Sequence, residues 1–139
     1  MEVVLYELKS EENLEEFLKI CEELNIKLII IQRKNSNIDY EKLKKPYVEI
    51  YRSLDEYLEN NKNKKFLIFE TYGNKFINEV DLKEFDAFVF GSEDYGIPLN
   101  EIEKFKNKEI VKIPTKIPGS YNVVSSFIIA LTFYKKCQK

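Results

Sequence analysis

Short apolar runs alternate with amphipathic stretches along most of this chain. These stretches have the spacing of helices, which are predicted over residues 11–24, from residue 53 onward, and over residues 98–105; a further helix, mostly apolar, is predicted over residues 121–136. Strands that run as continuous apolar segments are typical of a sheet covered on both faces. The pattern therefore predicts an α/β fold, a mainly parallel sheet with helices on both faces. The expected strands are residues 3–8, 27–32, 47–51, 66–69, 87–90 and 110–113.

The first predicted helix, residues 11–24, has clear start signals. Ser10 is a suitable N-cap, and Glu11 and Glu12 place negative charge in the first turn, where the helix dipole favours it. Its apolar residues recur every three to four positions, so one face should pack on the sheet. That face consists of Leu14, Phe17, Leu18, Cys21 and Leu24.

The last predicted helix, residues 121–136, is apolar around almost its whole circumference. A helix of this kind is normally buried on all sides. Three arrangements would achieve this: an ordinary central core helix, deep insertion into its own chain, or packing against a second subunit.

Composition limits the possible functions. A chain of 139 residues fits one domain, 1–139, and its net charge of −2 means that any nucleic-acid contact must come from a local basic patch. The chain has no histidine and only two cysteines, Cys21 and Cys137, so no Cys/His zinc site and no metal are expected. It has no apolar run long enough for a membrane span and no apparent signal peptide, so we expect a cytoplasmic protein without membrane contact.

Two Gly/Pro loops follow the predicted strands 87–90 and 110–113. The first is Gly91-Ser92-Glu93-Asp94-Tyr95-Gly96, and the second begins at Ile113-Pro114 and leads to Ser120 and Asn122. Loops at the carboxyl ends of parallel strands are the usual ligand sites of open α/β sheets. Taken alone, the glycine spacing is more typical of a solvated turn than of a ligand site. The two loops together, in this order, favour a ligand site.

In this order and spacing, the two loops resemble the second and third motifs of the SpoU (TrmH-like) branch of the SPOUT superfamily, over about residues 86–134. The resemblance implies an RNA 2′-O-ribose methyltransferase that uses S-adenosylmethionine and acts on tRNA or rRNA. It also implies an α/β knot with a C-terminal trefoil knot, which periodicity cannot predict, and a homodimer through the C-terminal helix.

The resemblance assigns the cofactor-binding residues by position. Backbone groups at Gly91 and Ile113 would hold the adenosine, and Thr71 matches a threonine of a third loop, after the strand 66–69. Ser120 and Tyr121 would complete the cofactor site next to the methyl group.

The same resemblance suggests the catalytic residues Asn13, Lys19, Glu93, Ser120 and Asn122. Lys19 stands where the family has arginine. Lysine lacks the planar fork that binds phosphate bidentately, although it could still contact a phosphate or act as a base. A solvated helix residue is an equally good interpretation of Lys19.

The expected RNA-binding residues are Arg33, Lys112 and Lys116, and Tyr95 and Tyr121 could stack on a base. Two alternatives stay open. One is a base-methylating enzyme of the same fold, and the other is a non-catalytic RNA-binding or scaffolding dimer.

Overall fold

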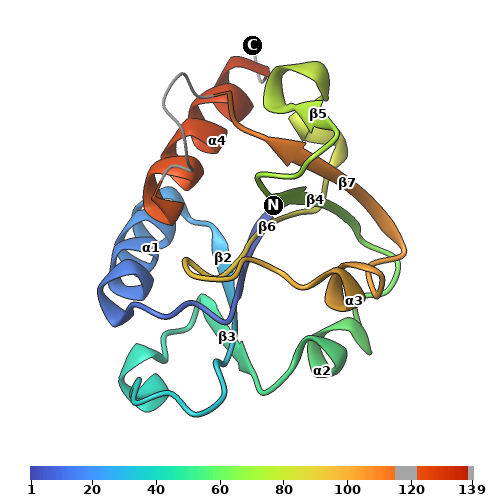
Figure 1. The fold of residues 1–139 in the computed structure, drawn as a ribbon. Helices are drawn as coiled ribbons and strands as arrows, with labels where there is room; N and C mark the ends of the chain where they lie inside the picture. The colour runs from blue at the N-terminus through green and yellow to red at the C-terminus, as the bar shows by residue number, and fades with distance from the viewer. Residues whose placement is uncertain (115–121, 138–139) are drawn as a thin grey trace.

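Seven parallel strands form one sheet in the computed structural model, which describes residues 1–114 and 122–137. The strand order is β3-β2-β1-β6-β4-β7-β5, so β1 and β6 pair at the centre although 80 residues of chain lie between them (Figure 1). The parallel sheet predicted from the apolar runs is confirmed. The strands are β1 (Glu2–Tyr6), β2 (Lys27–Ile31), β3 (Val48–Tyr51), β4 (Lys65–Phe69), β5 (Lys75–Phe76), β6 (Ala87–Phe90) and β7 (Asn107–Lys112).

Helices lie on both faces of the sheet. Helices α1 (Glu11–Leu24) and α4 (Val123–Cys137) lie side by side on one face, and α2 (Leu54–Leu58) and α3 (Leu99–Ile102) lie on the other (Figure 1). The rings of Phe17 and Phe127 stack 4.8 Å apart between α1 and α4. The described segments also contain three short 3₁₀ helices: η1 (Tyr40–Leu43), η2 (Ile77–Glu79) and η3 (Leu82–Glu84).

Alternation along the central strands divides the apolar side chains between two cores. In β1, Val3 and Leu5 pack with the α1–α4 layer, whereas Val4 and Tyr6 pack with the α2–α3 layer. All five residues of β1 are buried. This is the physical reason why a central parallel strand appears as a continuous apolar run rather than as an alternating one.

The start of α1 is as predicted, but its end is not. The Ser10 hydroxyl accepts a 3.1 Å hydrogen bond from the Asn13 backbone N–H, so Ser10 caps the helix. Leu24 was expected on the buried face, and that expectation is wrong because 39% of its surface is exposed. It lies in the last turn, immediately before Asn25 turns the chain away with a left-handed φ of 60°.

The predicted boundaries differ most at the two later helices. The helix expected over residues 98–105 is only Leu99–Ile102, and the last helix begins at Val123. Strand β5 was not predicted, because two exposed residues carry no periodic signal.

Helix α4 is not buried all round within this chain. Phe127 and Ala130 are buried in the core it shares with α1, whereas Ile128 is 50% exposed. In the described part of the chain, no helix has the length and apolar character to cross a membrane.

Candidate active site at the carboxyl ends of three strands

A cavity of about 580 Å³ opens where β4, β6 and β7 end. These strands are neighbours in the sheet, so the loops that follow Phe69, Phe90 and Lys112 converge. Side chains and backbone from all three loops line the cavity, together with the start of α4. The lining includes Phe69, Glu70, Thr71, Phe76, Phe90, Gly91, Ser92, Glu93, Gly96, Lys112, Ile113, Asn122, Val123 and Ser126.

Two glycines give the loop after β6 its shape. Ser92 and Gly96 exchange backbone hydrogen bonds of 2.9 and 3.3 Å, and Gly96 has a φ of 66°, which favours glycine. A β-carbon at Gly91 would lie only 2.7 Å from Ile97 Cγ1. Both positions therefore require glycine for a tight turn at the cavity wall.

Glu93 fastens this loop to the start of α1. Its carboxylate accepts hydrogen bonds from the backbone N–H groups of Lys9 (2.7 Å) and Ser10 (3.0 Å) and from the Asn13 side-chain amide (2.8 Å). A carboxylate at a helix N-terminus is favoured by the unpaired N–H groups there. The structure thus brings together two residues expected in the site, Asn13 and Glu93.

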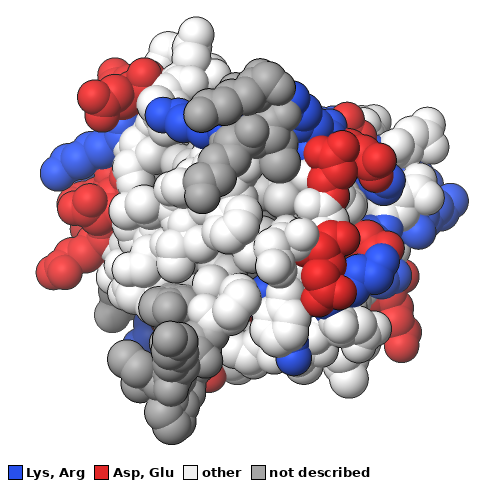
Figure 2. All heavy atoms as spheres, turned by 90° about the horizontal axis from the view of Figure 1, so that it is seen from above, with Lys and Arg blue, Asp and Glu red and all other residues white. Residues whose placement is uncertain are grey.

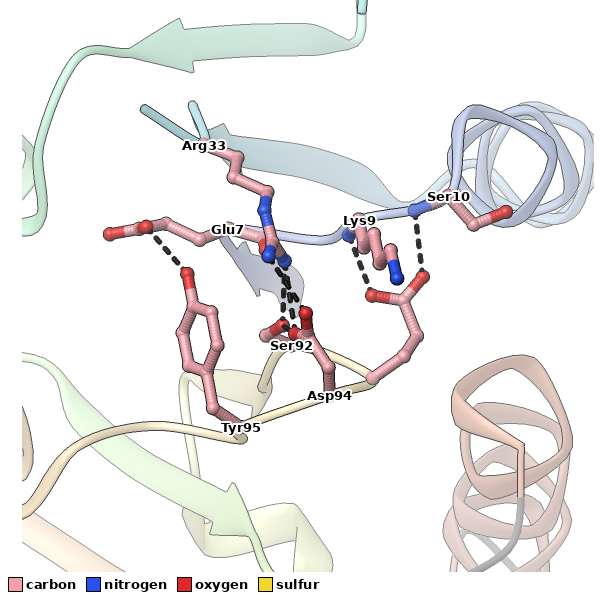
Figure 3. A network of polar contacts seen from close by, with 8 residues as sticks. Glu7, Lys9, Ser10, Arg33, Ser92, Asp94 and Tyr95 are labelled. Carbon is pink, nitrogen blue, oxygen red and sulfur yellow. Dashed lines mark hydrogen bonds and ion pairs between the residues drawn. The ribbon is translucent and has the colours of Figure 1, made fainter. Parts of the chain in front are cut away.

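Arg33, which follows β2, fastens the same loop from another side (Figure 3). Its guanidinium forms a bidentate pair with Asp94 at 3.0 and 2.8 Å and also donates to the Ser92 hydroxyl at 3.0 Å. This pairing, with a further hydrogen bond from Ser92, holds the pKa of Asp94 well below its usual value. The Tyr95 ring lies against Arg33, 4.9 Å from centroid to guanidinium carbon, and its hydroxyl donates to Glu7 at 2.9 Å.

Glu70 was not predicted, although it lines the cavity. Its carboxylate accepts a 2.7 Å hydrogen bond from the Ile97 N–H, and the Tyr72 hydroxyl donates to the Ile97 carbonyl at 2.9 Å. Burial raises the pKa of Glu70, partly offset by hydrogen bonds from the Ile97 and Thr71 amides. A carboxylate placed directly after a buried strand was the available sequence signal.

Six of the residues expected in the site line this cavity: Thr71, Gly91, Glu93, Lys112, Ile113 and Asn122. The side-chain oxygen of Asn122 accepts a 2.8 Å hydrogen bond from the Val124 N–H at the start of α4. Ser120, Tyr121 and Lys116 lie outside the described residues.

Two expected residues lie elsewhere. Lys19 is exposed on α1 and does not belong to the described lining of the cavity. Six residues along a helix place it about 9 Å beyond Asn13. Arg33 uses its guanidinium within the protein, as described above, and only 19% of its side chain is exposed.

The cavity suits an organic ligand of cofactor size. Its volume falls within the 300–1,000 Å³ typical of small-molecule sites, and its wall combines aromatic side chains with backbone made accessible by glycine. Within residues 1–114 and 122–137, no three His, Cys, Asp or Glu side chains are grouped to hold a metal ion.

Comparison with known proteins identifies relatives over nearly the whole chain. Two tRNA (cytidine(34)-2′-O)-methyltransferases align with it. The one from Saccharophagus degradans is 22% identical over 96% of this chain and 91% of its own length. The one from Burkholderia ambifaria is 25% identical over 85% of this chain and 75% of its own length.

Solved structures share the fold. A Bacillus anthracis protein with a provisional assignment as an RNA methyltransferase superposes with a TM-score of 0.79, at 28% identity over 99% of this chain and 93% of its own. A structure from work on 2′-OH methylation of C/U34 on tRNA gives a TM-score of 0.83, at 22% identity over 99% of this chain and 95% of its own. The AdoMet-bound rRNA methyltransferase of Sinorhizobium meliloti gives 0.77 at 14% identity, over 97% of this chain and 55% of its own.

The sequence model of the SpoU rRNA Methylase family matches residues 1–132. This match includes all three loops that form the cavity. It confirms the resemblance drawn from the Gly91 and Ile113 loops: the chain belongs to the SpoU rRNA methylase family.

Proposed function

We propose that this SpoU-family RNA methyltransferase, a single domain over residues 1–139, methylates the ribose 2′-oxygen of a tRNA nucleotide, with nucleotide 34 as its target. The observation that carries the proposal is the convergence of the Thr71, Gly91 and Ile113 loops on one cavity. Both curated relatives named above are tRNA (cytidine(34)-2′-O)-methyltransferases and align over most of the chain. These relatives favour tRNA over rRNA as the substrate, and the ribose over the base as the group that is methylated. A role on tRNA would place the protein in the cytoplasm.

S-adenosylmethionine is the proposed cofactor, and the cavity fits it in volume and in accessible backbone. Backbone groups at Thr71, Gly91 and Ile113 would hold it, together with Ser120 and Tyr121. When bound, it supplies a methyl group already activated on a sulfonium, so the protein needs no metal for the transfer.

The protein's own residues would position the substrate. Glu93 and Asn13 hold the loop after β6 against α1, and we assign both a positioning role. Asn122 caps α4 beside the cavity and would order the segment that contains Ser120. Lys19 would bind the phosphate of the target nucleotide, in place of the family's arginine.

The RNA would approach over the basic and aromatic residues near the cavity. The Lys112 ammonium lies 4.7 Å from the centre of the Phe76 ring, both residues line the cavity, and Lys116 follows four positions later in the sequence. Because Arg33 is paired with Asp94, we propose that it supports RNA binding indirectly, by holding Tyr95. Tyr95 is 48% exposed and its side chain is fixed by two contacts, which makes it suitable for stacking on a base.

We also propose a homodimer through α4, and the trefoil knot of the family at the C-terminus. The exposed Ile128 gives α4 an outward apolar position. The face seen from above the view of Figure 1 has few charged side chains at its centre, and Lys, Arg, Asp and Glu gather at its margins (Figure 2). Depletion of charge at the centre of a patch is typical of subunit interfaces.

The decisive experiment is methyl transfer from labelled S-adenosylmethionine to a tRNA transcript, followed by mapping of the modified nucleotide. We expect a 2′-O-methyl group at position 34. A methyl group found on a base would instead support the base-methylating alternative. Absence of transfer to any tRNA or rRNA would support the non-catalytic dimer.

Lys19 allows a sharper test of the catalytic assignment. Lys19→Ala should lower methyl transfer by roughly 10²-fold, while the Kd for S-adenosylmethionine stays unchanged. Lys19→Arg should retain or raise activity, because the planar guanidinium of arginine can bind the phosphate bidentately. Lys44→Ala is a matched control, since Lys44 is exposed and, among the residues that the structure describes, its ammonium pairs with Glu41. Full activity in Lys19→Ala would disprove this role.

A further inference from the structure

The Glu70 carboxylate is held in the cavity wall by the backbone of the loop that follows β6. A β-carbon at Gly96 would lie 2.6 Å from Glu70 Oε1 and 2.9 Å from Oε2, and one at Gly91 would lie 2.8 Å from Oε1. The 2.7 Å hydrogen bond from the Ile97 N–H fixes the carboxylate in this position. The glycines of the proposed cofactor loop therefore make room for Glu70 as well as for the ligand.

Glu70 has no cationic partner among the residues that the structure describes. The lysine of the cavity lining, Lys112, lies over the Phe76 ring, and no described ion pair includes Glu70. Burial of the carboxylate raises its pKa, which means that ionisation at this position costs free energy. A cationic ligand in the cavity would offset that cost.

Glu93, the other carboxylate of the lining, is in a different situation. Three donors from the start of α1 already satisfy it: the N–H groups of Lys9 and Ser10 and the Asn13 amide. It serves to hold the loop. Glu70 is thus the described carboxylate whose charge is available to a ligand.

We propose that the Glu70 carboxylate is the group by which the cavity prefers the cationic sulfonium of S-adenosylmethionine to the neutral thioether of S-adenosylhomocysteine. This inference rests on the proposed function. When the methyl group leaves, the sulfur accepts the bonding electron pair and loses its positive charge. Glu70 then loses its partner and the product is released more easily, so the residue limits product inhibition.

Calorimetric binding of both ligands tests this without any measurement of activity. The variant is Glu70→Gln, which removes the charge and keeps one oxygen acceptor for the Ile97 N–H. We expect this variant to raise the Kd for S-adenosylmethionine about tenfold, which corresponds to about 1.4 kcal/mol. The Kd for S-adenosylhomocysteine should change less than twofold. Glu103→Gln is the control, because Glu103 is an exposed carboxylate outside the cavity lining.

Two further measurements make the result decisive. Glu70→Asp retains the charge and should retain the preference, although the shorter side chain weakens the contact with Ile97. In the wild type, the affinity for S-adenosylmethionine should fall as the pH falls through the pKa of Glu70, and this dependence should be absent in Glu70→Gln.

The outcomes separate this inference from the proposed function. Equal weakening of both ligands by Glu70→Gln would overturn it and give Glu70 a hydrogen-bonding role, for example to a ribose hydroxyl. Unchanged binding of both would also overturn it, and in either case the methyltransferase proposal would stand. A wild type that binds neither ligand would overturn both proposals.

Discussion

The Asn13 side-chain amide donates a 2.8 Å hydrogen bond to the Glu93 carboxylate, across 80 residues of sequence. This contact joins the first helix to the loop that follows β6, and so it connects the amino-terminal part of the chain to the candidate cofactor site. Because Glu93 also accepts hydrogen bonds from the backbone N–H groups of Lys9 and Ser10, three hydrogen bonds hold the loop against the start of α1.

Glu93→Gln should therefore destabilise the protein and loosen the site. A glutamine has one acceptor oxygen, and its amide would face the N–H groups of Lys9 or Ser10. We expect a loss of about 1 kcal/mol in the free energy of unfolding, small because the contacts are exposed. Urea unfolding measures this, with Glu103→Gln as an exposed control that should stay within about 0.5 kcal/mol. Equal stability of the two variants would contradict the anchoring role.

Tyr95→Ala should raise the KM for RNA about tenfold, because stacking of one base on an aromatic ring contributes about 1–3 kcal/mol. The Kd for S-adenosylmethionine should not change. Tyr95→Phe retains the ring and loses only the hydrogen bond to Glu7, so it should behave almost as the wild type. Leu99→Ala, at another exposed apolar position, serves as the control. If Tyr95→Phe were as impaired as Tyr95→Ala, the hydroxyl rather than stacking would be responsible.

Ile128→Asp should convert a dimer into a monomer, because the new charge would be buried without a partner in the proposed interface. Phe133, on the same helix, is a less suitable position because it is partly buried and packs on the core. Light scattering at high micromolar concentration provides the test, with Leu99→Asp, on α3, as the control. A monomeric wild type under these conditions would exclude the proposed dimer.

Cys21 should be inert to thiol reagents in the folded state. Burial raises its pKa to about 12, and the thiol is completely enclosed by the core. In a Cys137→Ser background at about pH 8, we expect its reaction to be more than 10²-fold slower than that of a free thiol. Rapid reaction without unfolding would show that α1 opens locally.

The same thiol has a consequence for stability at high pH. The unfolded thiol ionises near its ordinary pKa of about 8.5, whereas the folded one stays neutral up to about pH 12. The contribution of the neutral Cys21 thiol to the free energy of unfolding is therefore complete below about pH 8.5 and is lost as the pH rises toward 12. The difference in melting temperature between Cys137→Ser and Cys21→Ala/Cys137→Ser, measured across this range, isolates the effect.

The sequence by itself determined the layers of the fold and the loops of the site. Apolar runs such as residues 87–90 identified buried parallel strands, because a strand covered on both faces has no polar side to display. The Gly91 and Ile113 loops could be recognised because tight turns and close backbone approach demand particular residues at particular spacings.

Only the tertiary structure decided which distant residues meet. The contacts between Glu70 and Ile97 and between Arg33 and Asp94 join residues 27 and 61 positions apart. Each depends on the strand order, which places β6 between β1 and β4. Local periodicity carries no information about that order, since the same apolar strand can pair with any neighbour. The position of Glu70 in the cavity wall, and its raised pKa, therefore became visible only in the folded chain.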